Sequence, residues 1–304
     1  MAQLIKLHEY ISRYEQHPYR YPGQFIKLKK ENWEKKHKEW EQQQAAPAPY
    51  LPEEEKEETN KKAWYQVFRK KDQEEDIEEN PAPVYIAPTE GALKQDFLEE
   101  LFDFQLKWAT STLGEFSFID HKYKKDPILR YFLKRFPDTF FVMYKPVFEV
   151  KQTTMEAETI LIHPLGIEII TVLEDKPEVL FWTSDERTWK REAKGRFTTF
   201  LNPMLSLNRT EKLVQGILRK YDIDLPIQKT VLSRENQIRF VSEPRNTKFI
   251  GSQKHTAWLM AKRQEPMALK HIQLRASEVL LEHSFTKAVA RPEWEAEEKE
   301  EFFS

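Results

Sequence analysis

ETILIHPLGIEIITVLED, residues 158–175, is the stretch that decides the fold. Two apolar runs, 159–162 and 167–173, flank the turn residues His163-Pro164-Leu165-Gly166, and Glu158 precedes the first run. Short apolar runs that are bounded by Pro and Gly are typical of buried strands joined in a hairpin. The stretch therefore predicts a β-hairpin with a carboxylate at the start of its first strand.

The segments on both sides of the hairpin predict an α+β core. Helical spacing of apolar residues, with Thr89 as a cap, Pro127 at a first helical position and Asn202-Pro203 at a helix start, predicts helices over 89–113, 126–137, 202–223 and within 265–285. Apolar runs predict further strands over 139–150, 178–184, 227–233 and 238–242. A mixed sheet flanked by helices is therefore expected, with the main domain over 89–255 and a C-terminal helix and acidic tail over 256–304.

The chain before residue 89 differs in composition. Apolar residues from Leu4 to Tyr14 fit one helical stripe, and a second helix is expected from about Gln24, so residues 1–40 are predicted to form a helical arm. Residues 41–88 are rich in Pro and Glu and poor in aliphatic residues. We expect this segment to be a disordered linker.

Composition excludes several classes of protein. The 304 residues include no cysteine, so disulfides, thiolate metal sites and cysteine nucleophiles are ruled out. The formal net charge of −2 gives no global field that attracts nucleic acid, and none of the 7 glycines belongs to a phosphate-binding loop. No stretch is apolar enough to span a membrane, so a cytoplasmic protein without membrane contact is expected.

Motifs on both sides of the hairpin follow a definite order. Asp126-Pro127-Ile128-Leu129, then Leu133 and Phe136-Pro137, precede it; Pro164-Leu165-Gly166-Ile167 lies within it; and Asn202-Pro203 follows it. In this order the chain resembles the nuclease-related domain (NERD) family, a branch of the restriction-endonuclease-like fold. The resemblance covers about residues 120–245 and implies that fold. It also implies site positions at Asp126, Glu158, Thr171 and Leu173.

The resemblance implies a Mg²⁺ site in active members, held by carboxylates and supported by a lysine from a Glu-x-Lys motif. Here Thr171-Val172-Leu173 occupies the motif, and threonine and leucine supply neither the carboxylate nor the ammonium. By strand alternation, Glu168 and Glu174 are expected on the face opposite to Thr171. The first hypothesis is therefore a catalytically degenerate domain, a pseudoenzyme without a firmly expected cofactor that acts as a binding module.

A working Mg²⁺-dependent endonuclease is the alternative. It would use Asp126 with Glu158, or a shifted set of Asp138, Glu149 and Lys151 that matches the proline, acid, acid-x-lysine signature of restriction enzymes. The shifted set needs a tight hairpin that turns near Lys145-Pro146. A single strand ending in exposed Glu149 and Lys151 explains the same residues.

The arm offers a further candidate surface. Lys27, Lys29, Lys30 and Trp33 could contact phosphates and bases of nucleic acid, although interspersed glutamates favour a solvated helix with intrahelical ion pairs. DNA or RNA is thus one possible partner, and a protein that binds the arm or the linker is another. Sequence alone does not predict the oligomeric state.

Overall fold

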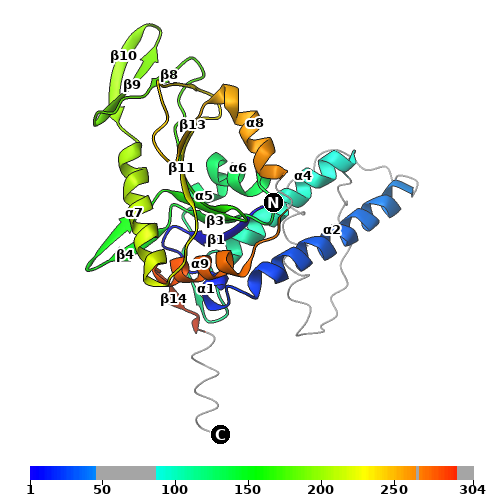
Figure 1. Ribbon diagram of the computed structural model, residues 1–304. Coiled ribbons are helices and arrows are strands. Elements are labelled where there is room, and N and C mark those ends of the chain that lie inside the picture. Colours follow the sequence, from blue (N-terminus) through cyan, green and yellow to red (C-terminus); the bar gives the residue numbers. More distant parts are fainter. Residues whose placement is uncertain (46–86, 265–266, 293–304) are drawn as a thin grey trace. The chain divides into compact units, whose positions relative to one another are not determined.

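The computed structural model describes residues 1–45, 87–264 and 267–292 (Figure 1). The chain divides into two compact units, of which one comprises Met1–Phe25 with Phe104–Ser304 and the other Ile26–Asp103. Helices and mixed sheets confirm the predicted α+β class. No helix in the described ranges is long and apolar enough to cross a lipid bilayer.

The core of the first unit is a six-stranded mixed sheet in the order β1-β3-β6-β7-β11-β13. Its strands are β1 (Gln3–Leu7), β3 (Phe141–Tyr144), β6 (Thr159–His163), β7 (Gly166–Val172), β11 (Ile227–Leu232) and β13 (Thr247–Ile250). The β3–β6 and β6–β7 pairs are antiparallel, whereas β1–β3, β7–β11 and β11–β13 are parallel. The predicted hairpin is therefore confirmed and lies at the centre of the sheet.

Gly166 fixes the geometry of this hairpin. Its φ of +144° lies in a region that side chains rarely adopt, and a Cβ atom there would lie 2.4 Å from the carbonyl oxygen of Pro226. Only glycine allows the backbone that precedes β11 to approach so closely. The turn between β6 and β7 is thus set by close backbone contact as well as by the pattern of the strands.

The N-terminal helical stripe from Leu4 to Tyr14 is a wrong prediction, because Gln3–Leu7 forms the edge strand β1 and only Arg13–Gln16 is helical, as α1. Every residue of β1 is buried, so no alternation of polar and apolar residues marks it as a strand. The buried Lys6 ammonium donates to Glu15 Oε1 at 2.7 Å. The residues predicted as the start of an arm therefore belong to the main sheet.

Helices α6 and α7 of the first unit begin where sequence signals place them. The described helices that lie wholly in this unit after α1 are α5 (Lys122–Lys125), α6 (Pro127–Arg135), α7 (Met204–Lys220), α8 (Ser252–Arg263) and α9 (His271–Glu282). Asn202 Oδ1 accepts from the N–H of Met204, which explains the start of α7. Helix α8 was not predicted, and it crosses the proposed boundary at 255/256. The region after residue 255 therefore continues the domain.

A four-stranded sheet in the order β10-β9-β8-β12 extends beyond the N-terminal end of α7 (Figure 1). Its strands are β8 (Leu180–Trp182), β9 (Thr188–Ala193), β10 (Arg196–Leu201) and β12 (Gln237–Arg239). Two-stranded sheets pair β4 (Val147–Val150) with β5 (Thr153–Glu156), and β14 (Val289–Ala290) with β2 (Glu115–Phe116).

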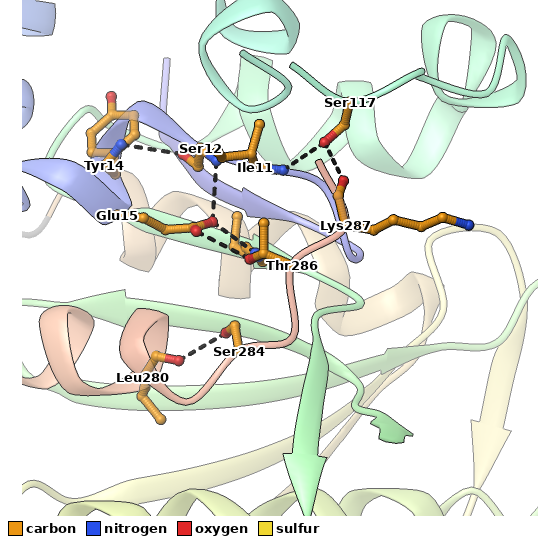
Figure 2. Close-up of polar contacts among 10 residues, drawn as sticks. Ile11, Ser12, Tyr14, Glu15, Ser117, Leu280, Ser284, Thr286 and Lys287 are labelled. Carbon is orange, nitrogen blue, oxygen red and sulfur yellow. Dashed lines mark hydrogen bonds and ion pairs between the residues drawn. The ribbon is translucent and has the colours of Figure 1, made fainter. Parts of the chain in front are cut away.

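The segment that follows α9 is fastened to the N-terminal region by polar contacts (Figure 2). Thr286 Oγ1 donates to Glu15 Oε2 at 3.1 Å, and Ser117 Oγ donates to the carbonyl oxygen of Lys287 at 2.6 Å. Ser117 Oγ also accepts from the N–H of Ile11 at 2.9 Å. The two ends of the described chain are therefore built into the same domain.

The second unit contains most of α2 (Tyr21–Ala45) and α4 (Glu90–Trp108). The Trp33 and Phe97 ring centroids lie 5.3 Å apart, and Trp40 Nε1 donates to the carbonyl oxygen of Ala87 at 2.8 Å. The predicted second helix and the predicted helix after Thr89 are confirmed. The predicted arm boundary at residue 40 falls within α2, and most of the predicted linker over 41–88 lies outside the described residues, as does most of the acidic tail.

Candidate functional site

A cavity of about 390 Å³ lies at one end of the central hairpin. Residues from the ends of β3 and β5, the start of β6, the end of β7 and the first turns of α7 line it. Its charged lining consists of Lys145, Glu156, Glu158, Glu174 and Arg209. The sequence-predicted positions Glu158 and Thr171 thus meet in one cavity.

Asp126 stands beside this cavity but serves as a helix cap. Its Oδ1 accepts from the N–H groups of Ile128 at 2.8 Å and Leu129 at 3.1 Å, which are unpaired donors at the start of α6. Its Oδ2 accepts from the hydroxyl of the cavity residue Tyr144 at 2.7 Å. Burial, reinforced by the Asp126 charge, raises the pKa of the Tyr144 phenol. The phenol therefore stays protonated and keeps donating to the carboxylate.

Glu158 is held by its backbone rather than by its carboxylate. Its N–H donates to Thr210 Oγ1 at 3.1 Å, which links the start of β6 to α7. The side chain is half-buried at the cavity, and no residue in the described part of the chain pairs with its carboxylate. Among the sequence-predicted carboxylates, Glu158 is therefore available to a ligand.

The two neutral positions of the site differ in placement. Thr171 is buried in the lining near the end of β7. Leu173 follows the last residue of that strand, and its N–H donates to the carbonyl oxygen of Leu232 at 2.8 Å. Leu173 does not belong to the lining. No ammonium group enters the cavity from this part of the hairpin.

Alternation correctly places Glu168 away from the cavity and fails for Glu174. Glu168 is fully buried on the other face of β7, and its Oε2 lies 2.9 Å from Lys262 Nζ. Glu174 lines the cavity because β7 ends at Val172, so the period of two no longer applies two residues later. Arg234 pairs with both Glu174 oxygens, which raises the pKa of the Arg234 guanidinium.

The shifted set of Asp138, Glu149 and Lys151 does not occupy one hairpin. Asp138 precedes β3, whereas Glu149 and Lys151 follow that strand, in and after β4. The hairpin that the set requires does not form, because β3 pairs with β1 and β6 while β4 pairs with β5. The structure thus provides no shared strand pair that would bring the three groups together.

The candidate residues of the arm lie on α2. Lys27 Nζ lies 3.7 Å from Glu31 Oε1, and Lys30 Nζ lies 3.8 Å from Glu34 Oε1. Trp33 packs on Phe97, as described above, and Lys29 has a polar or electrostatic partner as well. These are the intrahelical and packing contacts of a solvated helix. Contacts within the chain do not test nucleic-acid binding, so the phosphate and base contacts proposed for Lys27, Lys29, Lys30 and Trp33 stay a prediction.

Two cationic groups of the cavity were missed by sequence reasoning. Lys145 is exposed directly after β3 and has a φ of +44°, and Arg209 is exposed in the second turn of α7. The signals available were the turn at Lys145-Pro146 and the helix start at Asn202-Pro203. Neither signal reveals that β3 and α7 meet at the same end of the hairpin, because Lys145 and Arg209 are more than 60 residues apart in sequence and only tertiary packing brings them together.

The donor set does not fit the Mg²⁺ centre of the resembled family. Across the ranges that the structure describes, no group of three or more His, Asp or Glu residues is arranged to hold a metal ion. Both oxygens of Asp126 accept hydrogen bonds from protein groups, and the position of the third carboxylate is Thr171. The cavity is therefore better suited to direct contacts between side chains and a ligand than to a bound cation.

Comparison with known proteins gives one curated relative. No protein-family model and no solved structure matches the chain. Over 116 residues the chain is 37% identical to an RNA 2',3'-cyclic phosphodiesterase from Geobacillus stearothermophilus. The match covers 34% of this chain and 36% of the relative, so the chain spans about a third of the length of that protein.

Proposed function

We propose that the protein binds nucleic acid, with RNA as the preferred form, at the cavity beside Glu158, and that its domain is a divergent relative of the nuclease-related domain family without that family's metal-dependent chemistry. The observation that carries the proposal is the placement of Arg209 and Lys145 beside the carboxylate of Glu158. The name of the relative supports RNA as the class of ligand.

The charges of the cavity suit a ribonucleotide better than a bare phosphate. Arg209 and Lys145 can donate to phosphate oxygens, and the Arg209 guanidinium can do so with two parallel bonds. Glu158 can only accept while ionised, and an RNA strand offers it the 2'-hydroxyl or an amino group of a base. Arg234 offsets the charge of Glu174, so that carboxylate opposes an anionic ligand less.

A titration of fluorescein-labelled RNA and DNA strands of one sequence, followed by anisotropy at low and moderate salt, tests the proposal. Arg209→Ala should weaken binding about tenfold and lower the slope of log affinity against log salt by about 1. Arg219→Ala is the matched control, since Arg219 is an exposed arginine at the other end of α7. Glu158→Gln should reduce the preference for RNA over DNA. Absence of binding at low salt would remove nucleic acid as the partner.

A phosphodiester hydrolase is the second candidate, and the relative's name favours it. Its test uses RNA that ends in a 2',3'-cyclic phosphate, with release of a phosphomonoester as the readout. Nicking of supercoiled plasmid with Mg²⁺ or Mn²⁺ tests the metal-dependent alternative in parallel. Turnover that is lost in Glu158→Ala, in a variant that melts like the wild type, would replace the binding-only proposal with an enzyme.

A further inference from the structure

The sheet formed by β8, β9, β10 and β12 has one face that is buried in part, with Arg191 and Thr198 exposed on it, and one face open to solvent. The buried face carries Phe181, Trp189 and Ile238. Residues paired across neighbouring strands share a face, and the registers place Arg239 beside Trp182, Trp182 beside Lys190, and Lys190 beside Thr199. A second row on that side runs from Leu180 through Glu192 to Phe197. We name this side, with Trp182, Lys190, Phe197, Leu201 and Arg239, the open face.

The aromatic rings of the open face are exposed and lie close to each other. Trp182 is 40% exposed and Phe197 is 57% exposed, and their ring centroids lie 6.5 Å apart. Trp182 Nε1 donates to Glu192 Oε2 at 2.9 Å, which holds the indole in place. Exposed rings on a sheet that is already held by its opposite face add nothing to the core. They are available to stack on a ligand.

The charge of the same strands is strongly positive. Residues 188–201, which form β9, β10 and their turn, contain four basic residues and one acidic residue, a net charge of +3, although Arg191 and Arg196 lie on the opposite face. The whole chain has a net charge of −2. Lys190 and Arg239 project from the open face next to the Trp182 ring. Among the strand residues of the open face, these two cations outnumber the one carboxylate, Glu192, so this face suits a ligand that presents phosphates and flat rings together.

We infer that the open face binds single-stranded nucleic acid, with Trp182 and Phe197 stacking on bases and with Lys190 and Arg239 contacting phosphates. Cations that accompany aromatic rings on the exposed side of a sheet are the arrangement that binds unpaired bases. Bases in a duplex are stacked on one another, so they offer no free face to the two rings. The occupant is thus a single strand.

This inference rests on the proposed function and names the form of its ligand. Strand β10 of the open face is followed by helix α7, and Arg209 lies in the second turn of that helix, so the open face and the Arg209 side of the cavity come from consecutive elements (Figure 1). A strand whose bases stack on the open face can place a neighbouring nucleotide at Arg209. The single-stranded region would then be bound by stacking on the open face, and the adjacent nucleotide would be bound in the cavity.

The test is anisotropy titration of the full chain with a labelled 12-nucleotide uridine strand and with a labelled duplex of equal length. Phe197→Ala should weaken single-strand binding roughly 5- to 150-fold, whereas Phe197→Trp should preserve it. Leu201→Ala is the matched control, because Leu201 lies on the same face of β10, is 61% exposed and has no ring. Binding of the duplex should change less than twofold in every one of these variants.

Electrostatic contact is tested separately from stacking. Lys190→Ala should lower the slope of log affinity against log salt by about 1, and Lys212→Ala, an exposed lysine of α7, should leave it unchanged. Equal losses in Phe197→Ala and Leu201→Ala would overturn stacking, as would a loss for duplex as large as that for the single strand.

The Phe197 and Arg209 variants together distinguish this inference from the proposed function. Weaker binding in Arg209→Ala with no change in Phe197→Ala overturns the stacking surface and leaves the cavity as the binding site. Weaker binding in Phe197→Ala with no change in Arg209→Ala supports the open face and overturns the cavity. Absence of binding by all probes overturns both, and circular dichroism checks that each variant is folded.

Discussion

Replacement of Asp126 distinguishes a helix cap from a metal ligand. In Asp126→Ala, the N–H groups of Ile128 and Leu129 lose their acceptor, which costs about 1 kcal/mol. The Tyr144 hydroxyl also loses a charged acceptor at 2.7 Å, which costs about 1.5–3 kcal/mol. We expect the free energy of unfolding to fall by about 3 kcal/mol. For a domain of this size that corresponds to a melting temperature lower by roughly 6–12 °C.

Asp126→Asn is the matched control, because the amide oxygen can still accept from the helix start. It should cost about 2 kcal/mol, since the amide nitrogen in place of Oδ2 cannot accept from the Tyr144 hydroxyl while the helix cap is kept. Urea denaturation followed by tryptophan fluorescence measures both variants. A change of less than about 0.5 kcal/mol in Asp126→Ala would show that neither hydrogen bond stabilises the fold, and the cap assignment would fail.

The same denaturation experiment, repeated with Mg²⁺, tests whether Asp126 binds a metal ion. A metal bound with a Kd of about 1 mM would stabilise the native state by about 1.4 kcal/mol at about 10 mM Mg²⁺. We expect no such increase in the wild type, because the Asp126 oxygens accept hydrogen bonds from the protein. An increase of that size that disappears in Asp126→Ala would refute the reasoning and restore the metal-dependent alternative.

Three further predictions concern the fold around the site. Burial lowers the pKa of His163 to about 4, so the neutral imidazole stabilises the fold fully above about pH 6.5, and this stabilisation is lost as the pH falls towards 4. Between these two pH values the free energy of unfolding, measured with urea, should fall by about 3 kcal/mol less in His163→Gln than in the wild type. Gly166→Ala should lower the free energy of unfolding by about 3 kcal/mol, because the added Cβ would meet the backbone at Pro226. Gly195→Ala should cost only about 1 kcal/mol for its φ of +75°, because its Cβ would meet nothing within 4 Å. Thermal denaturation measures both variants. Lys262→Met should lower the free energy of unfolding by about 3–5 kcal/mol, because it leaves the Glu168 carboxylate buried without its cation. Adding Glu168→Gln to Lys262→Met should recover part of this loss. An equal loss in the single and the double variant would contradict the pairing.

The central hairpin was predictable because local signals agree there. Apolar runs and a glycine at the turn each favour the same structure, and the chain folds as they indicate. Strand β1 was not predictable in this way, because it is buried on both faces and contains Lys6. A lysine in a short apolar run suggests an exposed position, and only tertiary contact with Glu15 makes its burial tolerable.

Asp126 shows how one residue can satisfy two patterns. An aspartate before a proline is a common start of a helix, and the same residue stands where the resembled family has a glutamate ligand. The sequence cannot separate these roles, since both place a carboxylate at the same point of the chain. The hydrogen bonds separate them, because they use both oxygens within the protein.

The origin of the cations in the cavity limits the chemistry that it can perform. The strand position that would supply a lysine holds Leu173, while Lys145 comes from the end of β3 and Arg209 from α7. A guanidinium stays protonated at any physiological pH, so Arg209 can bind a phosphate and stabilise its charge but cannot transfer a proton. Glu174 pairs with Arg234, and Glu156 Oε2 lies 3.3 Å from His8 Nε2, so Glu158 is the cavity carboxylate best placed to act as a base. Phosphate contacts therefore favour binding, and any hydrolysis at this cavity should depend on Glu158 far more than on Asp126.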